Sequence, residues 1–238
     1  MGKPRESLPA AEVFLPVWGK GAAMYQNVAE LNRDCEDYSK WWRAVDQELY
    51  RYFAEHSDHG NLRSVYAKVA MVDRLYTTGL ERARKGTVEI DRAQKVAELL
   101  FARGEELDCG IRMISGVPCL TRDALADIAA LHGWIAETCL KEAGVGAPVS
   151  FGSKYLHFHV PVVPIYDQQA CASLARYIRG RFGRYVATPE RLPKLDGQMP
   201  AYRWYCARFA ELWEEARESR PETTVKELDY HLWVLGKT

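Results

Sequence analysis

The sequence predicts an all-α fold with about nine or ten helices, arranged as one helical domain over residues 21–238. Three observations support this prediction. Apolar residues recur at the three- and four-residue spacing of a helix face through most of the chain, no long alternating strand pattern occurs, and no internal repeat is evident. A chain of 238 residues is long enough for one large domain or for two small ones that share a core.

The first quarter of the chain divides into an arm and a helical region. Residues 1–20 are expected to form an irregular N-terminal arm because they hold the helix-breaking residues Pro4, Pro9, Pro16 and Gly19. Residues 21–60 then follow a helical pattern of apolar side chains. The polar stretch at residues 56–60 breaks this pattern and supplies helix caps.

Three helices and one connection are predicted in the middle of the chain. Residues 61–84 carry the apolar stripe of a strong helix, and residues 90–102 carry that of a second one. Residues 111–120 are expected to form a short apolar connection. A third helix runs over residues 121–142, where Thr121 is the N-cap and the end is marked by Gly144 and Gly146.

The C-terminal part of the chain is predicted to hold three further helices. They cover residues 168–179, 201–218 and 223–235, and a loop rich in proline and glycine lies at residues 188–200. The last helix carries an apolar face, so we assign residues 226–233 to the fold alone.

Composition restricts the classes of function and compartment. Lys and Arg together equal Asp and Glu at 32 each, so net charge gives no support for a nucleic-acid binder, although a local basic strip remains compatible with one. The six cysteines form no CxxC pair, and we expect no metal centre and no cofactor. No signal peptide or membrane span is evident, so a reducing cytoplasm is the simplest compartment.

Asp167 is the first candidate for chemistry. If a helix begins at residue 168, this aspartate is its N-cap, and the backbone N–H groups and the helix dipole favour the ionised carboxylate. A carboxylate in that position is suited to stabilise a developing cation or to orient a water. A plain helix cap is the competing interpretation, and for an isolated aspartate it is the more common one.

Lys154 is the second candidate, because it directly follows Gly152-Ser153. Ser153 is expected to cap a short helix that starts at Lys154, where the helix dipole lowers the free energy needed to remove the lysine proton. A lysine of lowered pKa can attack an electrophilic carbon. The competing interpretation is a solvated lysine or a phosphate contact.

Taken together, Ser150-Phe-Gly-Ser-Lys154 and Pro164-Ile-Tyr-Asp167 resemble the helix–hairpin–helix DNA glycosylase superfamily. In that family a Gly-hydrophobic-Gly-x-Lys hairpin is followed by a helix and then by a Pro-Val-Asp step. This chain departs from the pattern in three ways: Ser150 replaces the first glycine, the span from Lys154 to Asp167 is shorter than usual, and one extra residue separates the proline from the aspartate.

The resemblance implies a two-lobed helical fold with a central cleft for DNA and an extruded base, and a helix–hairpin–helix around residues 140–160. It implies that Asp167 is the catalytic aspartate and that Lys154 has the place of the lyase lysine of bifunctional members. The hairpin residues Gly152 and Ser153 would then contact the DNA backbone through N–H groups.

Further DNA contacts are expected from two other segments. By the same resemblance, the end of the helix near residue 76 lies at the duplex, which places Tyr76, Thr77 and Thr78 there. A plain amphipathic helix is the alternative. Basic residues after the aspartate are candidates for backbone contact, among them Arg179, Arg181 and Arg184, and the alternative for them is a solvated face.

Aromatic side chains near the two candidates are expected to form the base pocket. Base-flipping enzymes hold an extruded base between such rings. The predicted set, with core packing as the competing interpretation, is Tyr76, Phe151, Tyr155, His157 and Tyr166. The set shows no carboxylate suited to a charged alkylated purine. His157 and His159 diverge on a helix and no third ligand is evident, so a metal site is not expected.

The functional prediction is a monomeric DNA glycosylase that acts on double-stranded DNA, releases a modified base and leaves an abasic site. By resemblance to compact bacterial relatives with a role in antiviral defence, a hypermodified cytosine of phage DNA is the leading substrate. Two alternatives stay open. One is a non-catalytic helix–hairpin–helix DNA-binding module, and the other is a helical scaffold protein.

Overall fold

The computed structural model describes residues 28–78, 80, 92–117, 120–140, 142–144, 149–179 and 200–237. All the regular structure in these ranges is helical, which confirms the all-α prediction. The predicted arm at residues 1–20 lies outside the described residues. The helices are α1 Val28–Trp41, α2 Arg43–Glu55, α3 Leu62–Tyr76, α4 Arg92–Ala102, α5 Gly104–Ser115, α6 Arg122–Trp134, the π-helix η1 Ile135–Leu140, α7 Val149–His159, α8 Gln168–Arg179, α9 Pro200–Ser219 and α10 Val225–Leu235.

Side-chain caps define several of these boundaries. The Asn61 side chain accepts hydrogen bonds from the backbone N–H groups of Arg63 and Ser64 at the start of α3. Thr121 caps α6 in the same way, as predicted, through the N–H of Ala124. Thr224 and Glu227 form a reciprocal capping box at the start of α10. These caps satisfy N–H groups that a helix start leaves without partners.

Two predicted boundaries are wrong. The helix expected over residues 61–84 ends at Tyr76, because Thr77 has a left-handed backbone with φ of 46°. The connection expected at residues 111–120 begins inside a helix: α5 continues to Ser115, and its buried Leu107, Ile111 and Ile114 pack into the core. The apolar spacing of α5 therefore reflects a packed helix face.

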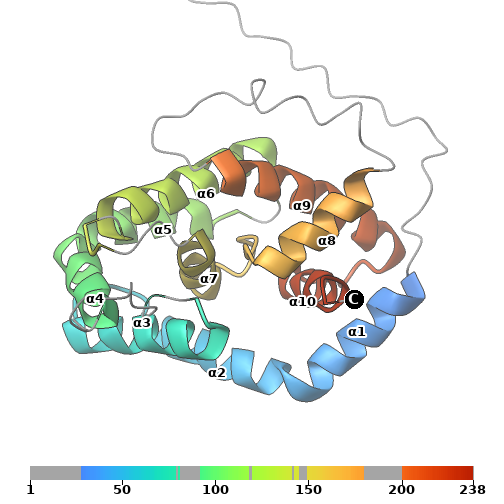
Figure 1. Ribbon diagram of the computed structural model, residues 1–238. Coiled ribbons are helices and arrows are strands. Elements are labelled where there is room, and N and C mark those ends of the chain that lie inside the picture. The colour runs from blue at the N-terminus through green and yellow to red at the C-terminus, as the bar shows by residue number, and fades with distance from the viewer. Residues whose placement is uncertain are drawn as a thin grey trace, which may run out of the picture.

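Helix α7 lies at the centre of the fold, with other helices around it (Figure 1). It packs against α2, α3, α5, α6 and η1. All residues from Phe151 to Phe158 are buried, polar ones included. A helix that is buried on every face is a core helix, and its polar side chains need partners within the protein.

The beginning and end of the described chain pack together through α10. This helix contacts α1, α8 and α9, and the ring nitrogen Nδ1 of His231 lies 2.7 Å from Asp34 Oδ2 of α1. Directly after α10, a Cβ at Gly236 would stand 2.5 Å from the carbonyl oxygen of Gln169. Only glycine allows this approach, which brings the end of α10 against the start of α8.

None of the helices in the described ranges combines the length and the apolar character needed to cross a membrane.

Candidate functional site

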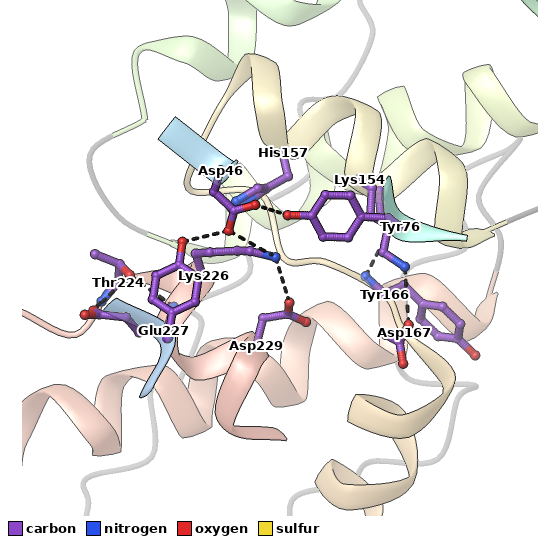
Figure 2. A network of polar contacts seen from close by, with 12 residues as sticks. Asp46, Tyr76, Lys154, His157, Tyr166, Asp167, Thr224, Lys226, Glu227 and Asp229 are labelled. Carbon is purple, nitrogen blue, oxygen red and sulfur yellow. Dashed lines mark hydrogen bonds and ion pairs between the residues drawn. The ribbon is translucent and has the colours of Figure 1, made fainter. Parts of the chain in front are cut away.

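A cavity of about 200 Å³ opens where α2, α3, α7, α8 and α10 meet. On a comparable measure a single water needs roughly 10–15 Å³, so a planar ring system fits in the space. The lining combines aromatic, acidic and basic side chains: Trp42, Asp46, Leu75, Tyr76, Thr77, Lys154, Asp167, Lys226, Asp229, Tyr230 and Trp233. Figure 2 shows six of these side chains close together: Asp46, Tyr76, Lys154, Asp167, Lys226 and Asp229.

Lys154 reaches the cavity from the interior of α7 and is only 3% exposed. Its Nζ donates hydrogen bonds to Ser150 Oγ at 2.8 Å and to Asp167 Oδ2 at 3.3 Å. Desolvation by burial lowers the pKa of Lys154, and the negative charges of Asp167 and Asp229 oppose this effect only in part. The structure thus brings the two candidates predicted from the sequence into one ion pair.

Asp167 is the N-cap of α8, as predicted. Its Oδ1 accepts a hydrogen bond from the backbone N–H of Gln169 at 2.9 Å. Its Oδ2 faces Lys154, and the side chain remains 25% exposed. One carboxylate therefore has an oxygen fixed by the helix start and an oxygen at the cavity, where it can meet a ligand.

A second carboxylate, Asp46 of α2, has its oxygens engaged by tyrosines. It accepts hydrogen bonds from the hydroxyl groups of Tyr38, at 2.8 Å, and of Tyr76. Lys226 of α10 lies 3.9 Å from Asp46 Oδ2, and its ammonium group stands over the Tyr76 ring at 4.6 Å. Asp46 is thereby fixed in place at the cavity wall.

Asp229 of α10 is the third carboxylate, and it differs from the others. Its Oδ2 accepts a hydrogen bond from Lys226 at 3.4 Å, whereas its buried Oδ1 has no hydrogen-bond partner among the described residues. Desolvation raises the pKa of Asp229 to about 6, although Lys226 and Lys154 favour the charged form. Figure 2 shows Lys226 between Asp46 and Asp229.

The charge and shape of the lining restrict what the cavity can hold. Three carboxylates face two ammonium groups, so the wall is slightly acidic when all of them are charged. Four aromatic rings complete the lining, which suits a flat, uncharged or cationic ring system. The rings belong to Trp42, Tyr76, Tyr230 and Trp233.

The predicted hairpin contact at Gly152 and Ser153 is wrong. Both residues lie buried inside α7, which begins at Val149. A Cβ at Gly152 would stand 3.1 Å from the ring of His132, so the glycine serves close packing against α6. Ser153 Oγ donates to the carbonyl of Ser150 and accepts from the N–H of Tyr166. Neither residue can offer its backbone to DNA.

The turn between η1 and α7 lies earlier in the chain. Gly144, the last described residue before the gap at 145–148, has φ of 69°, a left-handed conformation that glycine adopts at low energetic cost. A glycine in a left-handed conformation is thus found at Gly144, whereas Gly152, which precedes Lys154, has a packing role.

Most of the predicted base-pocket aromatics belong to the core. Phe151, Tyr155 and His157 are each 0% exposed, so the prediction that they stack on a base is wrong. His157 Nδ1 lies 2.8 Å from the carbonyl oxygen of Val163. Tyr76 does line the cavity, whereas Tyr166 packs edge-on against another tyrosine ring beside Asp167.

The predicted DNA contacts are placed unevenly. Thr77 lines the cavity, but Thr78 is buried and its hydroxyl donates to Asp73. Arg179 is the last residue of α8, and its side chain is not described. Arg181 and Arg184 lie outside the described residues.

Sequence reasoning missed the contribution of α10, which was assigned to the fold alone. Lys226, Asp229, Tyr230 and Trp233 all line the cavity. A signal was present, because Lys226 and Asp229 stand three residues apart in a helix, and this spacing brings charged side chains to the same face. Asp46 and Trp42 gave no comparable local signal.

No protein-family model, no curated protein and no solved structure matches the chain. Among the described residues, no group of three or more His, Cys, Asp and Glu side chains is arranged to hold a metal ion. The geometry of the cavity therefore carries the functional argument.

Proposed function

We propose that the protein is a DNA glycosylase that takes a modified base out of duplex DNA and cleaves its N-glycosidic bond at this cavity. One observation carries the proposal: Lys154 Nζ and Asp167 Oδ2 lie 3.3 Å apart at the edge of a cavity lined with aromatic rings. A nucleophile and a charge-stabilising carboxylate on one side, with stacking surfaces on the other, suit sugar–base cleavage.

In the hydrolytic reaction, Asp167 acts on the sugar. The bond between C1′ and the base nitrogen breaks, its electron pair leaves with the base, and that nitrogen takes up a proton. The ionised Asp167 stabilises the cationic sugar, and its Oδ2 accepts the proton of the water whose oxygen bonds to C1′. The hydrogen bond from Gln169 to Oδ1 fixes the carboxylate while this occurs.

Lys154 offers a second route at the same sugar. Burial lowers its pKa, which increases the fraction of neutral amine with a free lone pair. When Nζ forms a bond to C1′, the base leaves with the electrons of the broken bond, and opening of the sugar ring gives an imine. Loss of a proton from C2′ then permits β-elimination of the 3′ phosphate. Asp167, hydrogen-bonded to Nζ, is placed to accept the lysine proton.

The two-lobed arrangement is part of this proposal. Residues of α2, α8 and α10 line the cavity together with residues of α7 and of the end of α3. DNA would lie along this junction, with the extruded nucleotide between Tyr76 and the rings of α10. We also propose that the protein acts in antiviral defence and that its substrate is a hypermodified cytosine.

The test is mass spectrometry of bases released from several phage and bacterial DNAs by the purified chain. We expect one modified base to be released, and Asp167→Asn to reduce its rate at least about 100-fold, since Asn keeps the helix cap and lacks the charge. Asp108→Asn is the matched control, because Asp108 also pairs with a basic side chain yet lies away from this cavity. Full activity of Asp167→Asn would overturn the mechanism.

Trapping with borohydride separates the two routes. The hydride reduces the imine to a stable amine, so wild-type protein becomes covalently attached to DNA only if an amine of the protein attacks C1′, and loss of trapping in Lys154→Met but not in Lys226→Met assigns that amine to Lys154. Base release without trapping would assign hydrolysis to Asp167 alone. Salt-dependent DNA binding without any base release would instead indicate a DNA-binding module, and absence of salt-dependent binding would indicate a scaffold protein.

A further inference from the structure

We infer that Asp229 and Lys226 read the pairing edge of the extruded base, and that Asp229 Oδ1 selects an exocyclic amino group. The substrate class is then a modified cytosine or adenine, and the corresponding base with an oxo group at the same ring position is rejected. This inference rests on the proposed glycosylase function and assigns it a specificity-determining residue.

The first argument is the unpartnered oxygen. Asp229 is 6% exposed and lines the cavity, and its Oδ1 is a buried acceptor without a donor among the described residues. A buried polar atom without a partner costs about 1–3 kcal/mol, so most such atoms are paired. Because Asp229 lines the cavity, we infer that a ligand that carries an N–H group satisfies this oxygen.

The second argument is that the other two carboxylates are already used. Asp46 accepts hydrogen bonds from Tyr38 and Tyr76, and Asp167 from Gln169 and Lys154. Within the described part of the cavity lining, Asp229 is therefore the carboxylate with an acceptor to spare. Since Asp167 and Lys154 are assigned to the sugar, Asp229 is left to contact the base.

The third argument is the position of Lys226. Its Nζ lies 3.4 Å from Asp229 Oδ2, so a donor stands directly beside the free acceptor. Cytosine presents its N4 amino donor beside the N3 acceptor, and adenine presents its N6 amino donor beside N1, which complements this pair. Thymine, uracil and guanine carry a carbonyl oxygen at the position of the amino group.

A carbonyl at that position would meet the carboxylate, acceptor against acceptor. Sites that hold a buried hydrogen-bonding group reject a ligand that leaves the group unpaired by large factors, up to about 10⁴–10⁵. The side chains of Lys154 and Asp167 are close enough to Asp229 to affect its pKa, which places the sugar and base groups in one cavity. The aromatic rings hold the faces of the base and leave its edge for α10.

The test compares duplexes that differ only in amino and oxo groups. One pair carries 5-hydroxymethylcytosine or 5-hydroxymethyluracil, and another carries adenine or hypoxanthine, each at a single position. We expect wild type to release the amino member of a pair at least about tenfold faster than the oxo member. In Asp229→Asn the amide can donate to a carbonyl, so the preference falls below about threefold or reverses.

Asp34→Asn is the matched control. Asp34 is also a buried aspartate bonded to α10, through His231, but it does not line the cavity. Its substitution should leave the ratio of amino to oxo release unchanged. Equal release of both members by wild type, or an unchanged ratio in Asp229→Asn, overturns the inference while the glycosylase function stands. The ratio of amino to oxo release by wild type tests the inference even if Asp229→Asn fails to fold.

Failure of the proposed function is recognised separately. If wild type releases no base from any duplex, binding of free nucleosides decides the inference without catalysis. Trp42 and Trp233 line the cavity, so their fluorescence reports binding of cytidine against uridine and of adenosine against inosine. Tighter binding of the amino nucleosides, lost in Asp229→Asn, supports the inference. Absence of binding or of preference overturns it.

Discussion

Two buried polar clusters meet different faces of α7, and they are built in opposite ways. The first is the cavity around Lys154 and Asp167. The second, the histidine cluster, consists of His59, Lys68, Asp108, Tyr155 and His159. In the histidine cluster His59 Nδ1 donates to Asp108 at 2.5 Å, and His59 Nε2 lies 2.8 Å from the Tyr155 hydroxyl.

Burial and a shifted pKa are common to both clusters, so neither property identifies the site. Desolvation lowers the pKa of Lys68 to about 8 and also lowers that of Lys154. The partners differ. Lys68 donates to the carbonyl groups of His56 and Asp58 at 2.9 and 3.0 Å, whereas Lys154 faces a partly exposed carboxylate at a cavity. Lys68 therefore fixes the loop at residues 56–58, whereas Lys154 faces the cavity.

Cavity size does not identify the site either. A larger cavity of about 450 Å³ lies beside the histidine cluster, where Asp108 and His159 line it. Both of these side chains already have partners within the protein. Only the smaller cavity combines an ion pair with an unpartnered buried oxygen, that of Asp229, among the described residues. An unsatisfied polar atom at a cavity wall is the more informative sign of a ligand site.

The largest expected effect on stability is that of Lys68→Met. The substitution leaves the carbonyl oxygens of His56 and Asp58 without the donor they now share. We expect the free energy of unfolding in urea to fall by about 2–5 kcal/mol, since a hydrogen bond from a charged group contributes about 1.5–3 kcal/mol and two such bonds are lost. Lys40→Met, at an exposed lysine of α1, is the control and should change it by less than about 0.5 kcal/mol.

The stability contributed by the two clusters is expected to change with pH in opposite directions. The raised folded-state pKa of Asp229, about 6, contributes stability that is present below its unfolded value near 3.8 and is lost as pH rises through 6. The lowered pKa of His59, about 4, contributes stability that is present above 6.5 and is lost as pH falls toward 4. Lys226, Lys154 and Asp167 face Asp229 and oppose each other in part.

The measurement is urea unfolding at several values between pH 4 and pH 7. Relative to wild type, Asp229→Asn should gain at most about 3 kcal/mol of stability as pH rises through this window, because the variant lacks a carboxyl that must lose its proton while buried. His59→Gln should change in the other direction. Parallel pH profiles for wild type and both variants would contradict the assignment of these groups.

Lys154→Met should leave stability nearly unchanged. An apolar side chain of similar length replaces the buried ammonium group. Removing one partner of an ion pair is strongly destabilising only when the other charge is left buried, whereas Asp167 is partly exposed and keeps its bond to Gln169. We expect a change within about 1 kcal/mol in urea unfolding, together with complete loss of borohydride trapping. Destabilisation equal to that of Lys68→Met would remove the contrast between the two lysines.

The parts of this contrast that sequence predicted are local. The N-cap at Asp167 followed from the residues on either side of it, because a cap is set by the few residues around the helix start. Helix content followed from apolar spacing for the same reason. Gly152 misled the interpretation, since a glycine permits either a turn or close packing, and its partner His132 lies far away in the sequence.

The parts of the site that the sequence did not predict depend on packing between residues far apart in the chain. Asp46 and Lys226 are 180 positions apart in the sequence, and they meet because α10 closes over the start of α2 beside α1. Nothing in the residues around Asp229 shows that one of its oxygens stays without a donor. That property depends on every element packed against it and emerges only when the chain is folded.

A small stabilising effect is expected from relief of backbone strain, which also distinguishes the two clusters. Thr77, at the cavity, is the single non-glycine residue with positive φ in the described part of the chain. A β-branched residue in this conformation costs about 1–2 kcal/mol, and strain of this kind concentrates at functional sites.

Thr77→Gly should therefore raise the free energy of unfolding by about 0.5–1 kcal/mol, because glycine relieves the strain but gains entropy in the unfolded chain. Thr78→Gly is the control: it removes the hydroxyl bond to Asp73 and should destabilise the protein. If the strain serves the site, Thr77→Gly also slows base release while the protein becomes more stable. Stabilisation with unchanged release would show that the conformation of Thr77 only ends α3.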